Sequence, residues 1–213
     1  YITPPFTGPG GSARFAGGRL YEMTGQQHKF GAPFKERIWC RNAYNGRVLW
    51  EMELPEFVDA KQSTAVATDE AFFLLDNDKA GVRVIDPETG QLRKTISFGE
   101  EGEQCKWLGI DQNRLLVLVG KLAPPYIDGA SYHGTHETRK TIRKGKLNHG
   151  HRISAYDLKE DKMLWKYKTG EELIDPRAVA AWDGKIAFFL ESPEFRLDDK
   201  DEQVVGKRIV CLD

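Results

Sequence analysis

The residues of this chain best suited to chemistry are histidines, and four of the five lie in one segment, 121–151. They form two close pairs, one with two intervening residues and one with a single intervening residue. Such spacings can bring imidazole nitrogens to one metal ion, and Asp128 or Glu137 would add a carboxylate oxygen. One hypothesis for the segment is therefore a metal site. Its histidine ligands would be His133, His136, His149 and His151.

The same segment is basic, which favours a second hypothesis. Five cationic residues stand between the two histidine pairs, and positive charge disfavours the binding of a divalent cation. They are Arg139, Lys140, Arg143, Lys144 and Lys146. On this interpretation the histidines form hydrogen bonds or contact a partner, and the basic run contacts an acidic partner or a phosphate. Both hypotheses stay open at the level of sequence.

The elements that must position this segment are hairpins that recur along the chain. Three copies run over 38–50, 82–94 and 153–165, and the first strand of a fourth runs over 208–213. Each first strand alternates apolar residues and ends in Asn or Asp, whose short side chain can bond the backbone of the following turn. These residues are Asn42, Asp86, Asp157 and Asp213. The first two lie about 44 residues apart, a spacing typical of one four-stranded propeller blade.

Each hairpin turn has a position that favours glycine. Gly46 and Gly90 stand where the turn needs a positive φ angle, and Asp161 holds that position in the third copy. Trp50 and Trp165 occupy equivalent positions in the strand that follows the turn. We therefore expect the three hairpins to share one conformation, with the third turn the least ideal.

These residues resemble a known repeat. The pattern small-x-Asp-x-x-Thr-Gly-x-x-x-Trp is the tryptophan-docking motif of the PQQ-like repeat family, typified by quinoprotein alcohol dehydrogenases. Residues 40–50, 84–90 and 155–165 match it with changes, and Lys94 replaces the tryptophan of the second copy. The resemblance implies that the docking tryptophan packs between neighbouring blades. It implies a structural role for Trp50, Trp165, Asp86, Asp157, Gly46 and Gly90.

The repeats predict an all-β fold: a β-propeller of four-stranded antiparallel blades, with three complete blades and a partial fourth. We expect the blades at 12–54, 63–98, 105–168 and 177–213, all within one propeller domain over 1–213. Closed propellers contain about 4–8 blades. We therefore expect this chain to be part of a longer protein that supplies the remaining blades or domains.

The long insertions are expected on one face of the propeller. Strands of a blade alternate in direction, so the connections from second to third strand leave from the same face as the connections between blades. All three long insertions, 24–36, 121–151 and 192–207, are of this kind. Binding residues concentrate on loops that a rigid scaffold holds, so this face is the predicted binding face. The alternative is that the loops pack against other parts of the protein.

The composition gives no support for nucleic acid or a membrane as a partner. The chain is 40% hydrophobic and 30% charged, with a net charge of -1, so charge gives no argument for nucleic acid or a membrane surface. No apolar stretch approaches the roughly 18 residues of a membrane-spanning helix. Cys40, Cys105 and Cys211 are scattered and include no CxxC pair, which leaves their redox state open.

Two functional classes follow from the resemblance. One is a platform that binds a protein or small molecule through its loop-rich face, since the similar propeller lipoprotein of outer-membrane assembly is a scaffold without a cofactor. The other is a quinoprotein oxidoreductase of alcohol dehydrogenase type, with PQQ and calcium as cofactors. Such quinoproteins often carry an adjacent Cys-Cys disulfide in the cofactor pocket, which this chain lacks. We therefore favour the platform, leave enzymatic activity open, and expect an extracytoplasmic location, periplasmic or exported, from the likeness to exported propellers.

Overall fold

The computed structural model describes residues 12–25, 36–53, 64–76, 80–122, 149–191, 196–197, 203–204 and 207–213. The regular elements in these ranges are all β-strands, and neighbouring strands pair antiparallel. Among these residues there is no helix with the length and apolar character needed to cross a bilayer. Contacts divide the chain into two compact units, unit 1 with residues 1–77 and 81–97, and unit 2 with residues 78–80 and 98–213.

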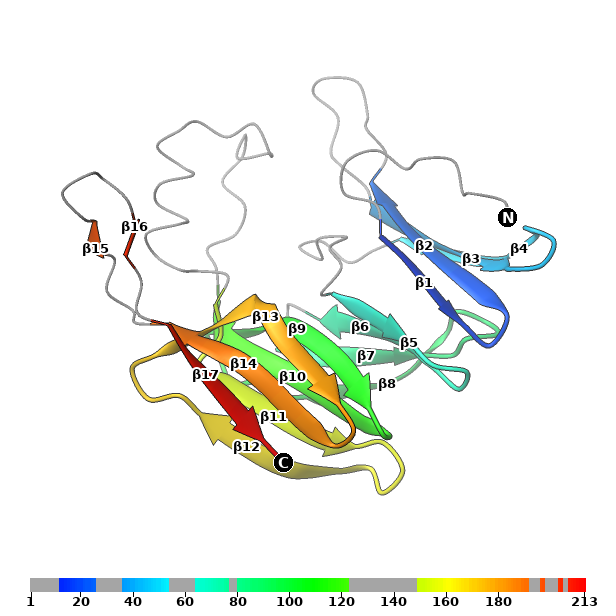
Figure 1. Ribbon diagram of the computed structural model, residues 1–213. Helices are drawn as coiled ribbons and strands as arrows, with labels where there is room; N and C mark the ends of the chain where they lie inside the picture. The colour runs from blue at the N-terminus through cyan, green and yellow to red at the C-terminus, as the bar shows by residue number, and fades with distance from the viewer. Residues whose placement is uncertain are drawn as a thin grey trace. The chain divides into compact units, whose positions relative to one another are not determined.

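Unit 1 contains two four-stranded sheets in which the strands pair in chain order (Figure 1). The first contains β1 (Ser12–Ala16), β2 (Arg19–Gly25), β3 (Glu36–Asn42) and β4 (Val48–Glu53). The second contains β5 (Ala65–Ala67), β6 (Phe72–Asp76), β7 (Gly81–Ile85) and β8 (Leu92–Ser97). Each sheet is thus one meander, as a propeller blade requires.

The two sheets of unit 1 share one apolar core. Alternate side chains of a strand point to the same face, so each sheet contributes every second residue. The rings of Tyr21 and Phe72 stack with their centroids 4.6 Å apart. The core contains Tyr21, Met23, Ile38, Cys40, Trp50, Ala65, Phe72, Leu74 and Ile85.

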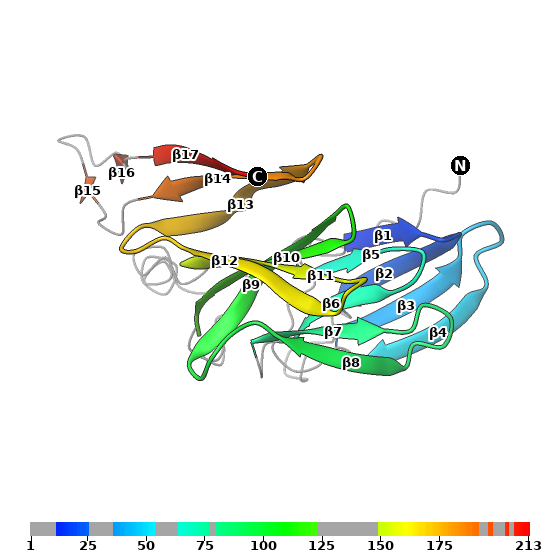
Figure 2. The same cartoon turned by 90° about the horizontal axis from the view of Figure 1, so that it is seen from below.

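Unit 2 begins with a four-stranded sheet, again in chain order (Figure 2). Its strands are β9 (Glu103–Asp111), β10 (Arg114–Lys121), β11 (Arg152–Asp157) and β12 (Lys162–Lys168). A three-stranded sheet follows, made of β13 (Leu173–Trp182), β14 (Lys185–Glu191) and β17 (Lys207–Leu212). Their shared core contains Leu116, Leu118, Ile153, Ala155, Ile174, Ile186, Phe188 and Leu190.

These sheets confirm the predicted fold class, a β-propeller of four-stranded antiparallel blades with three complete blades and a three-stranded fourth. The single domain over 1–213 stays a prediction. One boundary differs clearly, since β13 begins at Leu173 and not at Arg177. The strand pairing is interrupted between Ile174 and Val179, where Pro176 has no amide hydrogen to donate to a sheet.

The insertion 192–207 also contains an element that the sequence patterns did not predict. β15 (Arg196–Leu197) and β16 (Gln203–Val204) pair as a small antiparallel hairpin. Each of these strands has only two residues, which is too short for an alternating apolar pattern to reveal it.

The three repeated hairpins share their turn geometry. The oxygen of Asn42 accepts the amides of Tyr44 and Asn45, and Asp86 and Asp157 accept the equivalent amides in their own turns. The φ angle is positive at the expected position of each turn, with values of 72° for Gly46, 74° for Gly90 and 53° for Asp161. Asp161 tolerates this conformation less well than glycine does.

Candidate functional site

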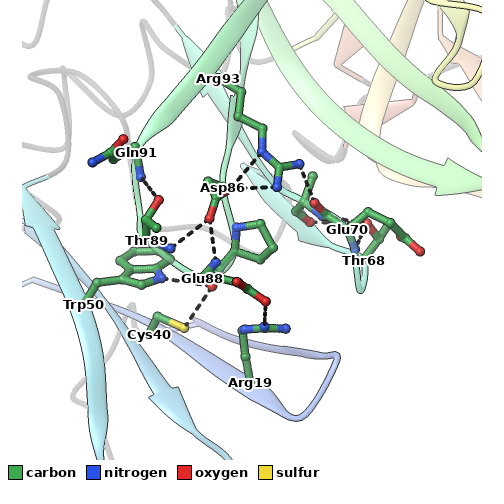
Figure 3. A network of polar contacts seen from close by, with 12 residues as sticks. Arg19, Cys40, Trp50, Thr68, Glu70, Asp86, Glu88, Thr89, Gln91 and Arg93 are labelled. Carbon is green, nitrogen blue, oxygen red and sulfur yellow. Dashed lines mark hydrogen bonds and ion pairs between the residues drawn. The ribbon is translucent and has the colours of Figure 1, made fainter.

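In unit 1, Trp50 joins the first sheet to the turn of the second (Figure 3). The indole is 8% exposed, and its nitrogen donates a hydrogen bond of 3.0 Å to the carbonyl of Pro87. The thiol of Cys40 lies 3.9 Å from the same oxygen. A Cβ atom on Gly90 would lie 2.7 Å from the indole ring, so the ring lies flat against a position that only glycine can fill.

The Asp86 carboxylate organises this turn. Arg93 donates two hydrogen bonds to it, of 3.1 and 2.7 Å, and the amides of Thr89 and Glu88 donate two more. These hydrogen bonds hold the pKa of Asp86 well below its usual range, and those from Arg93 have the largest effect. Glu88 in turn accepts a bond from Arg19 of the first sheet, at 3.1 Å. The turn is therefore held both by bonds within itself and by a bond from the first sheet.

Trp165 and Asp157 have a different setting in unit 2. Trp165 is half-buried and packs beside the core of that unit, where Val210 and Leu212 of β17 also pack. Asp157 accepts the amides of Lys159 and Glu160, which lower its pKa. Both residues belong to the repeated framework of the blade.

The charged side chains of unit 2 gather where the long connections leave its sheets. The connection 122–151 joins β10 to β11, and 192–206 joins β14 to β17. We call this the loop-bearing end of unit 2. It is defined by the five residues Glu103, His149, His151, Asp175 and Glu191. Backbone bonds between Gly150 and Ile174, of 2.9 and 2.7 Å, hold the end of the first connection beside β13.

Glu103 is the centre of the first cluster at this end. Arg152, whose side chain is 5% exposed, donates two hydrogen bonds to its carboxylate at 2.6 and 3.1 Å. His151 Nε2 lies 2.9 Å from the same carboxylate, and the Glu100 amide donates another hydrogen bond. Burial by itself raises the pKa of Glu103, but the bonds from Arg152, Glu100 and His151 outweigh it and the pKa is lowered. The carboxylate is therefore ionised at neutral pH.

Asp175 and Glu191 form the second cluster with His149. Ligand atoms of the three residues all lie within 4.8 Å of one another. His149 Nε2 is 3.2 Å from Glu191 Oε2, and Lys207 Nζ is 2.8 Å from the other oxygen of Glu191. Both carboxylates are buried.

Arg177 completes this second cluster. Its guanidinium binds both oxygens of Asp175, at distances from 2.6 to 3.2 Å. Burial raises the pKa of Asp175, but the bonds from Arg177 and the nearby charge of His149 reverse the shift and lower it. Chemically, the cluster offers one imidazole nitrogen and several carboxylate oxygens.

The structure thus separates two of the four predicted histidine ligands into different clusters. His149 contacts Glu191, whereas His151 contacts Glu103. His133 and His136 lie outside the described residues, so the four-histidine metal site stays a prediction. Sequence reasoning missed all three carboxylates, because each lies at a strand end or bulge far from the histidines in the chain. The one signal that could have identified these carboxylates in the sequence is their position beside the connections between strands.

Comparison with known proteins gives similarity of fold. No family model matches the sequence, and no curated protein matches it. BamB from Moraxella catarrhalis is 12% identical, with a TM-score of 0.41, and the match covers 84% of this chain and 44% of that one. The β-propeller domain of the Trilobed protease from Pyrococcus furiosus is 12% identical, with a TM-score of 0.47, over 93% of this chain and 53% of that one.

A protein of unknown function from Bacteroides caccae is also 12% identical, with a TM-score of 0.44, over 97% of this chain and 65% of that one. The chain therefore spans about half the length of these solved structures. At such identities, membership of the PQQ-like repeat family stays a prediction.

Proposed function

We propose that this chain is part of a β-propeller platform that binds a protein partner through the loop-bearing end of unit 2. One observation supports this most: two charge networks, each centred on a carboxylate with little exposure, fix the bases of two long connections at the same end. Glu103 holds the first through Arg152 and His151, and Glu191 holds the second through His149 and Lys207. Anchored loops lose less conformational freedom when they bind, which favours affinity.

The two ends of unit 2 differ in the length of their connections, with the long ones at one end as a binding platform requires. At the opposite end the strands are joined by tight turns, such as the pair with positive φ at Gln112 and Asn113. Short turns offer little adaptable surface, whereas polar loops on rigid strands are where propellers and other scaffolds place their binding residues. The mixture of cations and carboxylates at the loop-bearing end suits a partner with polar side chains of both signs.

The proposal extends to the setting of the protein. We place it outside the cytoplasm, as a periplasmic or exported protein, on the resemblance of its repeats to exported propellers.

A photo-crosslinking amino acid placed at single positions of the full-length protein tests this proposal. Positions 122, 177 and 207 report on the loop-bearing end, and positions 159 and 185 report on the opposite end. We expect partner adducts in cells of the source organism from the first set only. Adducts at both ends with equal yield, or at the opposite end only, would contradict the proposal.

The PQQ-dependent oxidoreductase is the competing function. Titration of the full-length protein with PQQ and calcium, with alcohol-dependent dye reduction as the readout, separates the two. We expect no turnover. Sustained turnover that depends on PQQ would replace the platform proposal with the quinoprotein one.

A further inference from the structure

We propose that His149, Asp175 and Glu191 form a binding site for a divalent transition-metal ion of the Zn²⁺ class. The ligand atoms of these residues lie within 4.8 Å of one another. They come from three separate segments: the residue before the Gly150 bridge, the irregular part of β13, and the last residue of β14. This set shares only His149 with the histidine site that the sequence suggested.

The spacing of the donor atoms fits coordination to one ion. Zinc binds imidazole nitrogen and carboxylate oxygen at about 2.0–2.2 Å, so two ligands at a tetrahedral angle stand about 3.4 Å apart. The observed separation of His149 Nε2 and Glu191 Oε2 is 3.2 Å. This pair of donor atoms is therefore already close to the separation that one ion requires, and the Asp175 carboxylate lies within 4.8 Å of both.

The backbone around the site is fixed before any ion binds. Paired hydrogen bonds between Gly150 and Ile174 hold the residues next to His149 and Asp175. The pairing of β13 with β14 is irregular between Ile174 and Val179, and bulges of this kind redirect side chains at functional sites. Leu173 pairs with Glu191, so alternation places Asp175 on the same face as Glu191, at the point where the irregular stretch begins.

Burial gives the physical reason for a cation. Asp175 is 4% exposed and Glu191 is 5% exposed, and ionised groups removed from water need opposite charge close by. Two of the cations beside them lie toward solvent, since the side chain of Arg177 is 83% exposed and that of Lys207 is 50% exposed. A divalent ion bound among the three ligands would supply two positive charges at the buried position.

The donor set selects the class of ion. One imidazole with two carboxylates suits Zn²⁺, Mn²⁺, Fe²⁺ or Co²⁺, whereas calcium and magnesium prefer oxygen ligands alone. Arg177 competes for Asp175, but each carboxylate oxygen has a further lone pair that an ion can use. Arg177 therefore weakens binding without blocking it.

Cobalt titration of the full-length protein tests the site, because bound Co²⁺ gives visible absorption bands and Zn²⁺ displaces it. We expect saturable binding of one ion and a rise in melting temperature with added Zn²⁺. His149→Ala, Asp175→Asn and Glu191→Gln should each weaken binding at least about tenfold. Arg177→Ala should tighten it by roughly two- to tenfold, because a competing charge is removed.

His151→Ala is the matched control, since that imidazole contacts Glu103, and its metal affinity should stay within about twofold of the parent. Circular dichroism without metal establishes that each variant is folded. The Arg177→Ala variant adds a test that misfolding cannot mimic, because its expected effect is tighter binding. The proposal fails if the parent binds neither Co²⁺ nor Zn²⁺ at 1 mM, since a useful site has a dissociation constant below about that concentration. It also fails if His133→Ala and His136→Ala abolish binding while Asp175→Asn and Glu191→Gln do not. The assay contains no protein partner, so its outcome is independent of the proposed platform function.

Discussion

At the scale of single residues, Trp50 shows how one side chain joins two blades. Its ring is buried against Gly90 and its nitrogen is satisfied by Pro87. Both the apolar and the polar part of the indole therefore contribute to the junction.

Trp50→Ala should destabilise unit 1 by about 3–5 kcal/mol, since it leaves a cavity in the core and removes a buried hydrogen bond. The measurement is the free energy of unfolding in urea. Trp182→Ala is the control, because Trp182 is 48% exposed and should cost about 0.5 kcal/mol or less. Equal effects of the two substitutions would contradict the docking role of Trp50.

The cysteines should differ in reactivity. Burial raises the pKa of Cys40 to about 11, and only the thiolate reacts with alkylating or disulfide reagents. Cys40 and Cys105 are buried, whereas Cys211 is exposed. In a thiol assay at pH 8 we expect one fast-reacting group in the native protein and three after denaturation. Loss of the fast phase in Cys211→Ser would identify it, and a native protein with two or three fast thiols would contradict the burial.

At the scale of the elements, two turn glycines form a natural comparison. Gly46 and Gly90 have nearly equal positive φ angles, of 72° and 74°. A Cβ atom at Gly46 meets no atom within 4 Å, whereas one at Gly90 would overlap the ring of Trp50. The same substitution therefore separates backbone strain from contact between blades.

Gly46→Ala should cost about 1–2 kcal/mol from backbone strain alone. Gly90→Ala should cost about 1–3 kcal/mol more, because the new methyl group displaces a buried ring. Urea unfolding followed by tryptophan fluorescence measures both. Equal costs would show that the Trp50 ring does not depend on this turn.

The cluster at Glu103 controls how the base of the connection from β10 to β11 is held. Glu103→Ala leaves the buried Arg152 without its carboxylate and should cost about 3–5 kcal/mol. Glu172→Ala removes a more exposed pair with Arg208 and should cost no more than about 1 kcal/mol. A Glu103→Ala variant as stable as Glu172→Ala would contradict the role given to this cluster.

The same cluster sets a dependence on pH. The folded-state pKa of Glu103 is lowered from its ordinary 4.5, so the folded state binds the proton less readily than the unfolded state. Its contribution is fully present above pH 4.5 and is lost as the pH falls through the lowered folded-state pKa. Glu103→Gln should be less stable at pH 7 and should lose less stability on acidification. Parallel curves of unfolding free energy against pH for the parent and this variant would contradict the assignment.

At the scale of the whole molecule, the last sheet has an apolar face directed away from its core. Phe189 pairs with Ile209, and Ala187 pairs with Cys211. Ile209 is 67% exposed. Ile186, Phe188 and Leu190, on the opposite face of the same sheet, lie in the core of unit 2. The outward face is thus apolar enough to favour a further contact.

The 213-residue chain should self-associate through this face. Light scattering in reducing buffer should give an average mass that rises with protein concentration, and Ile209→Lys should reduce that rise. Val48→Lys is the control, since Val48 is an exposed apolar residue of unit 1. A strictly monomeric parent, or equal effects of the two substitutions, would contradict the prediction.

The sequence by itself determined the fold class, because its evidence is local. Turn formation depends on residues three or four apart, so Asn42, Asp86 and Asp157 with the positive-φ positions indicated the hairpins, and strand alternation indicated the blades. The predicted start of β13 was wrong by a few residues, because the irregular pairing around Pro176 interrupts the alternation of apolar and polar residues.

Only the tertiary structure decided which charged groups meet. Glu103 is 48 residues from His151 in the chain, and His149 is 42 residues from Glu191. No local spacing relates such positions; the register between strands and the packing of neighbouring sheets bring them together. The histidine pair His149-x-His151 thus looked like one site in the sequence, and the structure places its members against different carboxylates. Strand alternation does not explain this, because residues two apart in an extended chain share a face. The tertiary contacts do: Gly150 bridges to Ile174 of β13, next to Asp175, and leaves His149 beside Glu191, whereas His151, just before β11, meets Glu103.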